Sequence, residues 1–122
     1  MCRLIVNKII RIGDSERWSD VVIHNGVARW VEIASDRSRD AEHQIEQVLD
    51  QIDETLPQIG SDRESLLQIL IYLTNPDHLD VLNRLWDKWV PKGHAPVRAC
   101  VHCGLSGGCH VEMIITAAVT SA

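Results

Sequence analysis

The sequence predicts an α+β domain in which two amphipathic helices cover one face of a mixed β-sheet. Two stretches carry apolar residues at three- and four-residue spacing, which is typical of helices, and six shorter stretches carry the alternating or continuous apolar runs of strands. Their order along the chain is β-β-β-α-β-α-β-β. With 122 residues the chain fits one domain, residues 1–122, which is long enough to bury a core without disulfides or a structural metal.

The first third of the chain predicts an edge strand followed by a β-hairpin. Branched residues fill Leu4 to Ile12 and indicate the edge strand. Further on, Asn25-Gly26 separates the runs Asp20 to His24 and Val27 to Ile33. Both residues of an Asn-Gly pair tolerate positive φ, so this pair predicts a two-residue turn between two antiparallel strands.

A polar connector, residues 35–40, leads into the first predicted helix and offers Asp36 or Ser38 as its N-cap. The apolar stripe of this helix comprises Ala41, Ile45, Val48, Leu49, Ile52 and Leu56. The opposite side is acidic, which is typical of a solvated helix face. Pro57 and Gly60 are expected to mark the end of the helix.

The next strand, Ser65 to Leu73, is apolar on both alternating faces, which predicts a central strand covered on both sides. The sequence Asn75-Pro-Asp77 then caps a second helix. Its buried stripe is expected to contain Leu79, Leu82, Leu85, Trp86 and Trp89. Two helices on one face leave the other face of the central strand uncovered, and self-association would supply the missing surface.

The last two predicted strands, Val97 to Val101 and Val111 to Val119, carry the chemistry that the residues suggest. Alternation places Arg98 and Cys100 on one strand face, and a hairpin between the strands is expected to bring Glu112 near Arg98. An arginine and a glutamate beside a cysteine suit a small carboxylate substrate, because guanidinium binds carboxylate through two parallel hydrogen bonds. A cross-strand ion pair between Arg98 and Glu112 is the structural alternative.

Composition excludes several kinds of partner. The chain has 17 acidic and 12 basic residues and no basic run, which disfavours nucleic acid and anionic membranes. Its apolar start is interrupted by Arg3, Asn7 and Lys8, so neither a signal peptide nor a membrane span is expected, and we predict a cytoplasmic protein. In that setting cysteines are expected to be free thiols.

The cysteines and histidines near the C-terminus raise the alternative of a metal or redox module. The five potential ligands are Cys100, His102, Cys103, Cys109 and His110. An extended strand points Cys100 and Cys103 to opposite faces, whereas a zinc knuckle needs a tight turn between them. We therefore predict no metal site, and zinc analysis is the measurement that separates this alternative from the others.

Several segments resemble the Rid (YjgF-like) family. Its C-terminal signature is similar to Ala95 to Val101, followed by Val111-Glu-Met and Ala117 to Val119. Arg17 to Asn25 looks like the family's first strand and Leu79 to Trp89 like its second helix. The match is closest to the subgroup with an Arg-Trp-Ser-Asp start and a Gly-His-Ala-Pro-Val-Arg run. The resemblance implies a chorismate-mutase-like fold, a homotrimer with pockets between subunits, and cofactor-free hydrolysis of 2-imino acids to 2-keto acids and ammonia.

The resemblance also implies roles for individual residues. Arg98 would clamp the substrate carboxylate, and Glu112 would position or activate a water molecule. Cys100 would be a pocket-lining thiol, and Trp18 would form the aromatic wall where many members have a tyrosine. Asn83 stands at a recurrent asparagine position of the second helix.

Three features depart from the family pattern. Trp18 lacks the phenolic hydroxyl, Val31 to Ala34 replaces a small glycine-containing segment, and Ser106-Gly-Gly108 replaces a Leu-Pro turn. Within the second of these, a Glu32 carboxylate facing the pocket would oppose a carboxylate substrate. These departures keep open a second function, that of a non-enzymatic protein that binds a small metabolite or another protein.

Overall fold

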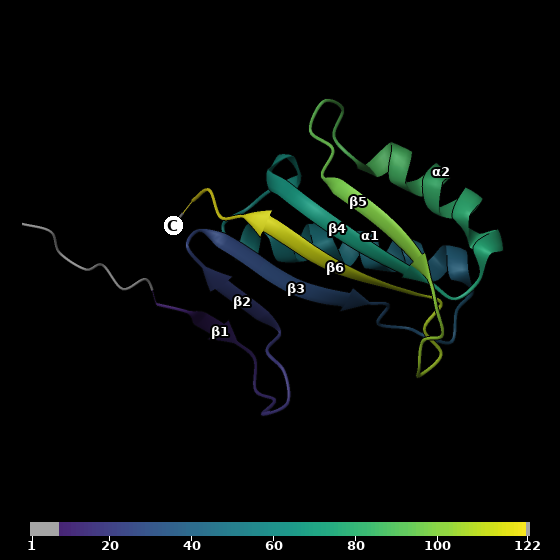
Figure 1. Ribbon diagram of the computed structural model, residues 1–122, viewed down its shortest axis with the longest axis horizontal. Helices are drawn as coiled ribbons and strands as arrows, with labels where there is room; N and C mark the ends of the chain where they lie inside the picture. The colour runs from purple at the N-terminus through teal and green to yellow at the C-terminus, as the bar shows by residue number, and fades with distance from the viewer. Residues whose placement is uncertain (1–7, 122) are drawn as a thin grey trace, which may run out of the picture.

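The structure is a computed structural model that describes residues 8–121. It contains one six-stranded sheet with the strand order β1-β2-β3-β6-β4-β5 (Figure 1). The strands are β1 (Ile10–Ile12), β2 (Val21–His24), β3 (Val27–Ile33), β4 (Leu66–Leu73), β5 (Val97–His102) and β6 (Val111–Ala118). The helices are α1 (Ala41–Gln58) and α2 (Leu79–Trp89), with short 3-10 turns at Arg63–Ser65 and Pro76–His78. The predicted class and element order are confirmed.

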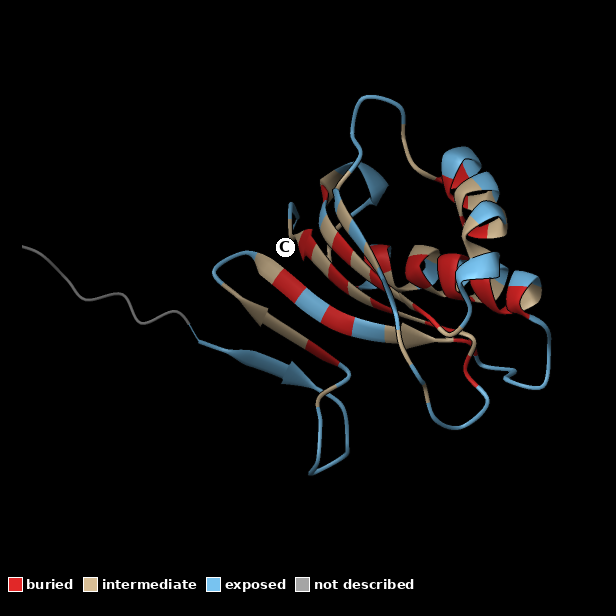
Figure 2. Ribbon diagram, turned by 45° about the vertical axis from the view of Figure 1, so that its right-hand side comes forward, coloured by how far each residue is buried: buried red, intermediate tan, exposed pale blue. Residues whose placement is uncertain are grey.

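Both helices lie on the same side of the sheet, and the core fills the space between them and the strands (Figure 2). Burial alternates along β6, where Val111, Met113, Ile115 and Ala117 are buried and the residues between them are partly exposed. The side chains of Ile45 and Ile52 on α1 are fully buried against this face. Period-2 burial on the strands and period-3.6 burial on the helix are the patterns that the sequence carries.

The N-terminal hairpin forms as predicted. Asn25 and Gly26 adopt φ values of 54° and 72°, which the tight turn between β2 and β3 requires. β1 is an edge strand that pairs with β2 over Ile10–Ile12. The predicted strand began at Leu4, and its residues 4–7 lie outside the described part of the chain.

The predicted N-cap of α1 is wrong. The capping residue is Asp40, whose carboxylate accepts a hydrogen bond from the backbone N–H of His43 at 3.0 Å. The carboxylate of Asp36 instead accepts two local hydrogen bonds from Ser38, so both predicted caps are occupied in a turn before the helix. The helix also continues one residue past Pro57.

The predicted C-terminal hairpin is also wrong. β5 pairs in parallel with β4, while β6 pairs antiparallel with both β3 and β4, so β4 separates β5 from β6. The reason is the crossover through α2, since a strand, a helix and a second strand joined in succession form a parallel unit that places the two strands side by side. The connection from β5 to β6 passes the end of β4, where the backbone N–H groups of Thr74 and Cys103 donate to the carbonyls of His110 and Leu73.

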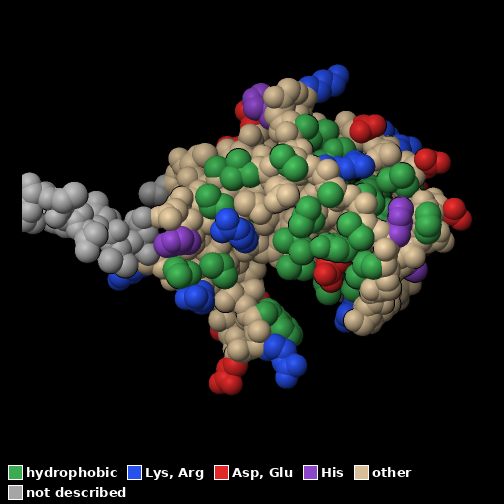
Figure 3. Space-filling model, in the orientation of Figure 1, with side chains coloured by type: hydrophobic (Ala, Val, Ile, Leu, Met, Phe, Trp, Pro, Cys, Tyr) green, Lys and Arg blue, Asp and Glu red, His purple; other side chains and the backbone are tan. Residues whose placement is uncertain are grey.

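The sheet face away from the helices carries many apolar side chains (Figure 3). Val31, Val97 and Val101 on this face are exposed by 53%, 66% and 45%. No described residue of the chain forms a layer over it. The expectation that another subunit covers this face therefore stays a prediction. Neither helix in residues 8–121 has the combination of length and apolar character needed to cross a membrane.

Candidate functional site

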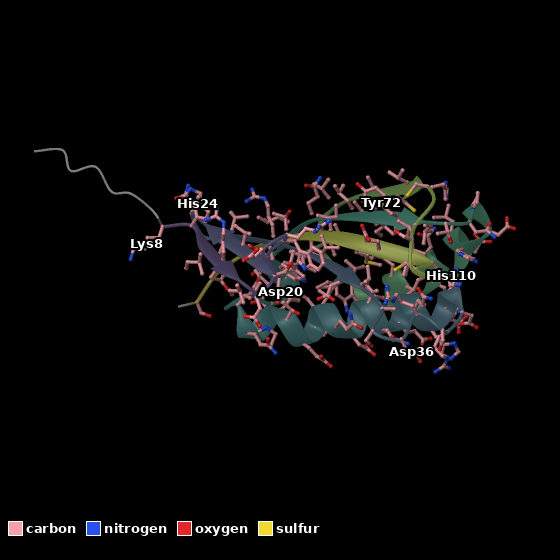
Figure 4. The ribbon with its side chains drawn as sticks, turned by 90° about the horizontal axis from the view of Figure 1, so that it is seen from below. Lys8, Asp20, His24, Asp36, Tyr72 and His110 are labelled. Carbon is pink, nitrogen blue, oxygen red and sulfur yellow. The ribbon has the colours of Figure 1, made fainter. Side chains whose placement is uncertain are left out.

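Arg98 and Glu112, the two residues expected to carry the chemistry, lie on opposite faces of the sheet. Arg98 stands beside the fully buried Ile69 in the parallel pairing of β5 with β4, so its side chain is on the helix face. Glu112 stands between Ile33 of β3 and Tyr72 of β4, on the uncovered face. Figure 4 shows Tyr72 on the side of the sheet away from α1. The expectation that one hairpin brings Arg98 and Glu112 together is therefore wrong for a single subunit.

The guanidinium of Arg98 is held by residues of α2. Its Nη2 donates to Asn83 Oδ1 at 2.9 Å, and its central carbon lies 5.2 Å from the centroid of the Trp86 ring. The hydrogen bond and the cation–π contact fix the plane of the group at the edge of the sheet. Arg98 belongs to none of the ion pairs in the described chain, which excludes the cross-strand pair with Glu112 within one subunit. Its other N–H groups are available for a carboxylate.

Cys100 lies two residues further along β5, on the same face as Arg98, and packs against the core. Burial raises the pKa of the Cys100 thiol, and the nearby Arg98 charge opposes this effect with a smaller lowering. The thiol is therefore neutral at pH 7 and is suited to packing beside a ligand rather than to nucleophilic attack.

Two adjoining cavities border Glu112, with volumes of about 690 and 520 Å³, and the larger is also lined by Glu32 and Thr55 from the helix side. Both are lined by Trp18, Ile33 and Glu112. Figure 3 shows the corresponding hollow between the projecting β1–β2 loop and the body of the sheet. Trp18 belongs to that loop, and its side chain is 64% exposed. The structure thus brings together Trp18 and Glu112, and separately Arg98, Asn83 and Cys100.

The loop that carries Trp18 depends on a glycine. Gly13 has a φ of 129°, and a Cβ atom at this position would lie 2.8 Å from the backbone nitrogen of Asp20. That nitrogen donates to the carbonyl of Ile12 at 2.6 Å and closes the base of the loop. Only glycine allows this close approach, so Gly13 fixes the point from which Trp18 projects.

Glu32 does not share a sheet face with Glu112. Its carboxylate accepts hydrogen bonds from Trp30 Nε1 at 3.1 Å, Gln51 Nε2 at 2.9 Å and Thr55 Oγ1 at 3.3 Å. Glu32 lines the larger cavity, but these bonds hold its carboxylate toward α1. The concern that Glu32 opposes a substrate carboxylate beside Glu112 is correspondingly reduced.

Comparison with known proteins adds an independent line of evidence. Residues 11–119 match the model of the family described as endoribonuclease L-PSP. The chain belongs to this family. It is 41% identical to the RutC family protein YoaB of Escherichia coli K12 over 112 residues, which cover 91% of this chain and 98% of YoaB.

Two solved structures that are more than 30% identical to this chain agree with the fold. A YjgF family member from Neisseria meningitidis has a TM-score of 0.87 at 34% identity, covering 94% of this chain and 98% of its own. An uncharacterized protein from Pseudomonas aeruginosa has a TM-score of 0.86 at 35% identity, with coverage of 91% and 98%. The resemblance to the YjgF-like proteins, a family that includes imine deaminases, is confirmed at the level of family and fold. The subgroup and the residue roles stay predictions.

The cysteines and histidines that the structure describes in this L-PSP family member do not form a metal-binding cluster. Within residues 8–121, no three His, Cys, Asp or Glu side chains come close enough to hold a metal ion. Cys100, Cys103 and Cys109 are unpaired thiols, and Cys2 lies outside the described residues. Cys100 and His102 lie on β5, whereas Cys103, Cys109 and His110 lie in the connection between β5 and β6. The structure gives the metal-module alternative no support.

Sequence reasoning missed Gln44, a fully buried polar side chain. Its Nε2 donates to the carbonyls of Arg37, Arg39 and Gly108, and its Oε1 accepts from the backbone N–H of His110 at 2.8 Å. Gln44 thereby joins the β3–α1 connector to the β5–β6 loop, the two segments that border the smaller cavity. A glutamine within an otherwise apolar helical stripe was the only signal of this role.

Proposed function

We propose that this protein hydrolyses 2-imino acids to 2-keto acids and ammonia in a cleft between subunits of a homotrimer. The observation that carries the proposal is the separation of Arg98 from Glu112. Arg98 has an oriented guanidinium with free N–H groups at the edge strand, and Glu112 has a carboxylate without an ion-pair partner in the described chain, beside a cavity on the opposite face. The two groups can act on one small substrate if Arg98 of one subunit meets Glu112 of the next.

The proposed chemistry needs only these groups and water. Arg98 binds the substrate carboxylate through two hydrogen bonds and so fixes the imine carbon. Glu112 accepts a proton from a water molecule while the water oxygen bonds to the imine carbon. The C=N electron pair moves to the nitrogen, which takes up a proton from solvent. Glu112 then passes its proton to the amino nitrogen of the adduct, the C–N bond breaks as ammonia leaves with the electron pair, and loss of the hydroxyl proton to solvent forms the keto group. No cofactor is required.

The remaining predicted residues fit supporting roles. Asn83 orients the guanidinium of Arg98, and Cys100 packs beside it as a neutral thiol. Trp18 supplies an aromatic wall to the cavity on the Glu112 side. The uncovered apolar sheet face supports self-association, since a patch of this kind is otherwise an aggregation hazard. Free thiols and the acidic composition suit the proposed cytoplasmic location.

The family description names an endoribonuclease, but the charges of this chain do not favour RNA. The formal net charge is −5, and the larger cavity is lined by Asp20, Glu32 and Glu112 without any lysine or arginine. RNA binding depends on cations that neutralise phosphates. The better second candidate is a non-enzymatic binder of a small carboxylate, which the missing phenol at Trp18 favours.

The first test replaces Arg98. Arg98→Ala is expected to lower the rate of ketoacid release from 2-aminoacrylate by about 100-fold or more, because the substrate loses its orienting contact. Arg98→Lys is expected to rescue little, because one ammonium cannot reproduce two parallel hydrogen bonds. Enzymatically generated 2-aminoacrylate and a coupled ketoacid assay measure both rates. Unchanged turnover with a lower melting temperature would make Arg98 structural.

A mixing experiment tests whether the site is shared. Arg98→Ala and Glu112→Gln subunits are each expected to be inactive alone and to regain activity when unfolded together and refolded. In a randomly mixed ring, about one quarter of the clefts would combine an intact Arg98 with an intact Glu112 from the neighbouring subunit. No recovery in oligomers of confirmed mixed composition would contradict a shared site. Tight binding of a 2-keto acid by the wild-type protein without any turnover would support the binder instead.

A further inference from the structure

The guanidinium of Arg37 lies against the glycine pair that replaces the usual turn between β5 and β6. A Cβ atom on Gly107 would be 2.7 Å from Arg37 Nη1, and one on Gly108 would be 3.3 Å from the Arg37 carbonyl oxygen. Gly107 and Gly108 also have φ values of 69° and 82°. Any larger residue at position 107 would displace the guanidinium as well as strain the backbone. The glycine pair therefore makes the space that Arg37 occupies.

The backbone on both sides of this contact is fixed by one side chain. Gln44 Nε2 donates to the Arg37 carbonyl at 3.2 Å and to the Gly108 carbonyl at 3.1 Å. Both segments are therefore anchored to α1. The Arg37 side chain, although exposed, starts from a fixed backbone position beside the cavity.

Arg37 supplies a positive charge to the cavity of about 520 Å³ that also contains Trp18 and Glu112. Its side chain has neither an ion-pair nor a hydrogen-bond partner among residues 8–121, and it does not pair with Glu112. The adjoining larger cavity is lined by Asp20 and Glu32 and by no cation. The hollow thus has an acidic end and a basic end, with Glu112 common to both cavities.

We propose that Arg37 binds a second carboxylate of the substrate, and that the preferred substrates are short 2-imino dicarboxylic acids. This inference rests on the proposed function. The neighbouring subunit's Arg98 would hold the carboxylate next to the imine, Glu112 would face the imine carbon, and Arg37 would hold the side-chain carboxylate. A guanidinium without a competing partner is the group best suited to that contact. Asp20, which lines the larger cavity, would repel the same carboxylate, so the charges favour one orientation.

The test compares two substrates that differ in one carboxylate. Amino acid oxidation of glutamate and alanine supplies 2-iminoglutarate and 2-iminopropionate, and the variants are Arg37→Gln and the matched control Arg39→Gln. Arg39 is exposed on the same connector and does not line the cavity. Arg37→Gln is expected to lower kcat/KM for 2-iminoglutarate about tenfold or more, because one charged contact is commonly worth that factor. It should leave the value for 2-iminopropionate within about twofold, and Arg39→Gln should leave both values within about twofold.

An equal loss on both substrates would overturn the inference, because Arg37 would then act on the shared carboxylate or on folding. No loss on 2-iminoglutarate would overturn it as well. Calorimetric binding of 2-oxoglutarate and pyruvate provides a readout that is independent of turnover. Wild-type protein should prefer 2-oxoglutarate, and Arg37→Gln should abolish the preference. If neither imine is hydrolysed but the protein still prefers 2-oxoglutarate to pyruvate, the proposed function fails while the dicarboxylate site stands. Equal binding of the two keto acids refutes the site.

Discussion

Replacement of Gln44 by methionine isolates the network that holds the two segments beside the smaller cavity. Methionine has a similar length and shape and is a good helix former, so the change removes hydrogen bonds with little change in volume. Four bonds are lost, at 3.2, 3.0 and 3.1 Å from Nε2 and at 2.8 Å to Oε1. Gln44 is 0% exposed, so water does not reach the side chain in the folded protein.

The magnitude follows from the partners. Because the two hydrogens of Nε2 serve three acceptors, the network amounts to about three neutral hydrogen bonds, which at a net 0.5 to 1.5 kcal/mol each give about 1.5 to 4.5 kcal/mol. Three of the bonds are to carbonyls of the exposed residues Arg37, Arg39 and Gly108, where water can take over part of the bonding. That compensation places the expected loss in the free energy of unfolding at about 1.5 to 3 kcal/mol.

Urea denaturation at one fixed protein concentration measures the loss, since the stability of an oligomer depends on concentration. Gln58→Met is the matched control, because Gln58 is an exposed glutamine on the same helix, and it should change the free energy of unfolding by less than about 0.5 kcal/mol. A loss below about 1 kcal/mol for Gln44→Met would show that the network contributes little to stability. It would also remove the argument that Gln44 fixes the backbone of Arg37.

Two further predictions concern Glu32 and Cys100. Glu32→Gly is expected to lower the free energy of unfolding by about 2 kcal/mol or more without raising imine turnover, because three donors lose their acceptor. Glu32→Gln should retain most of the stability, and a gain of activity in the glycine variant would mean that Glu32 does act in the cleft. Because burial raises the pKa of Cys100, its thiolate fraction at pH 8 is lower in the folded than in the unfolded protein, and peptide mapping after iodoacetamide treatment should find this cysteine alkylated more slowly in the folded state. Equal rates in the two states would contradict that environment.

Local patterns in the sequence were enough to predict the elements but not all of their partners. The Asn25-Gly26 turn and the apolar stripe of α1 each report on neighbours a few residues away, and these predictions are confirmed. In α2, Leu82, Trp86 and Trp89 are buried as predicted, whereas Leu79 and Leu85 are only partly buried. The pairing of β5 depends instead on the crossover through α2, which returns the chain to the far side of β4. Adjacency in sequence favoured a hairpin with β6, and the central position of an apolar β4 was the stronger constraint.

The same limit applies to the site. The contact between Asn83 and Arg98 was not predicted, because the family resemblance marked Asn83 only as a recurrent position and nothing in the spacing of α2 and β5 required the contact. Gln44 and Gly108 are 64 residues apart, and no local pattern joins them. The available signal was the glycine pair at Gly107 and Gly108, a departure from the family turn that had no explanation until Arg37 was found beside it.

The distribution of family-like and divergent features bears on how activity and specificity are divided in this protein. On the Arg98 side, the arginine, the asparagine bonded to it and the adjacent thiol are the residues to which the family resemblance assigns roles. The divergent features lie on the Glu112 side, where Trp18 lines both cavities and Arg37 occupies the space left by Gly107. A group that binds the carboxylate common to all 2-imino acids has reason to stay constant, while the surface that meets the variable part of the substrate can change. Substitutions at Arg98 should therefore decide whether any imine is hydrolysed, and substitutions at Arg37 should decide which imines are.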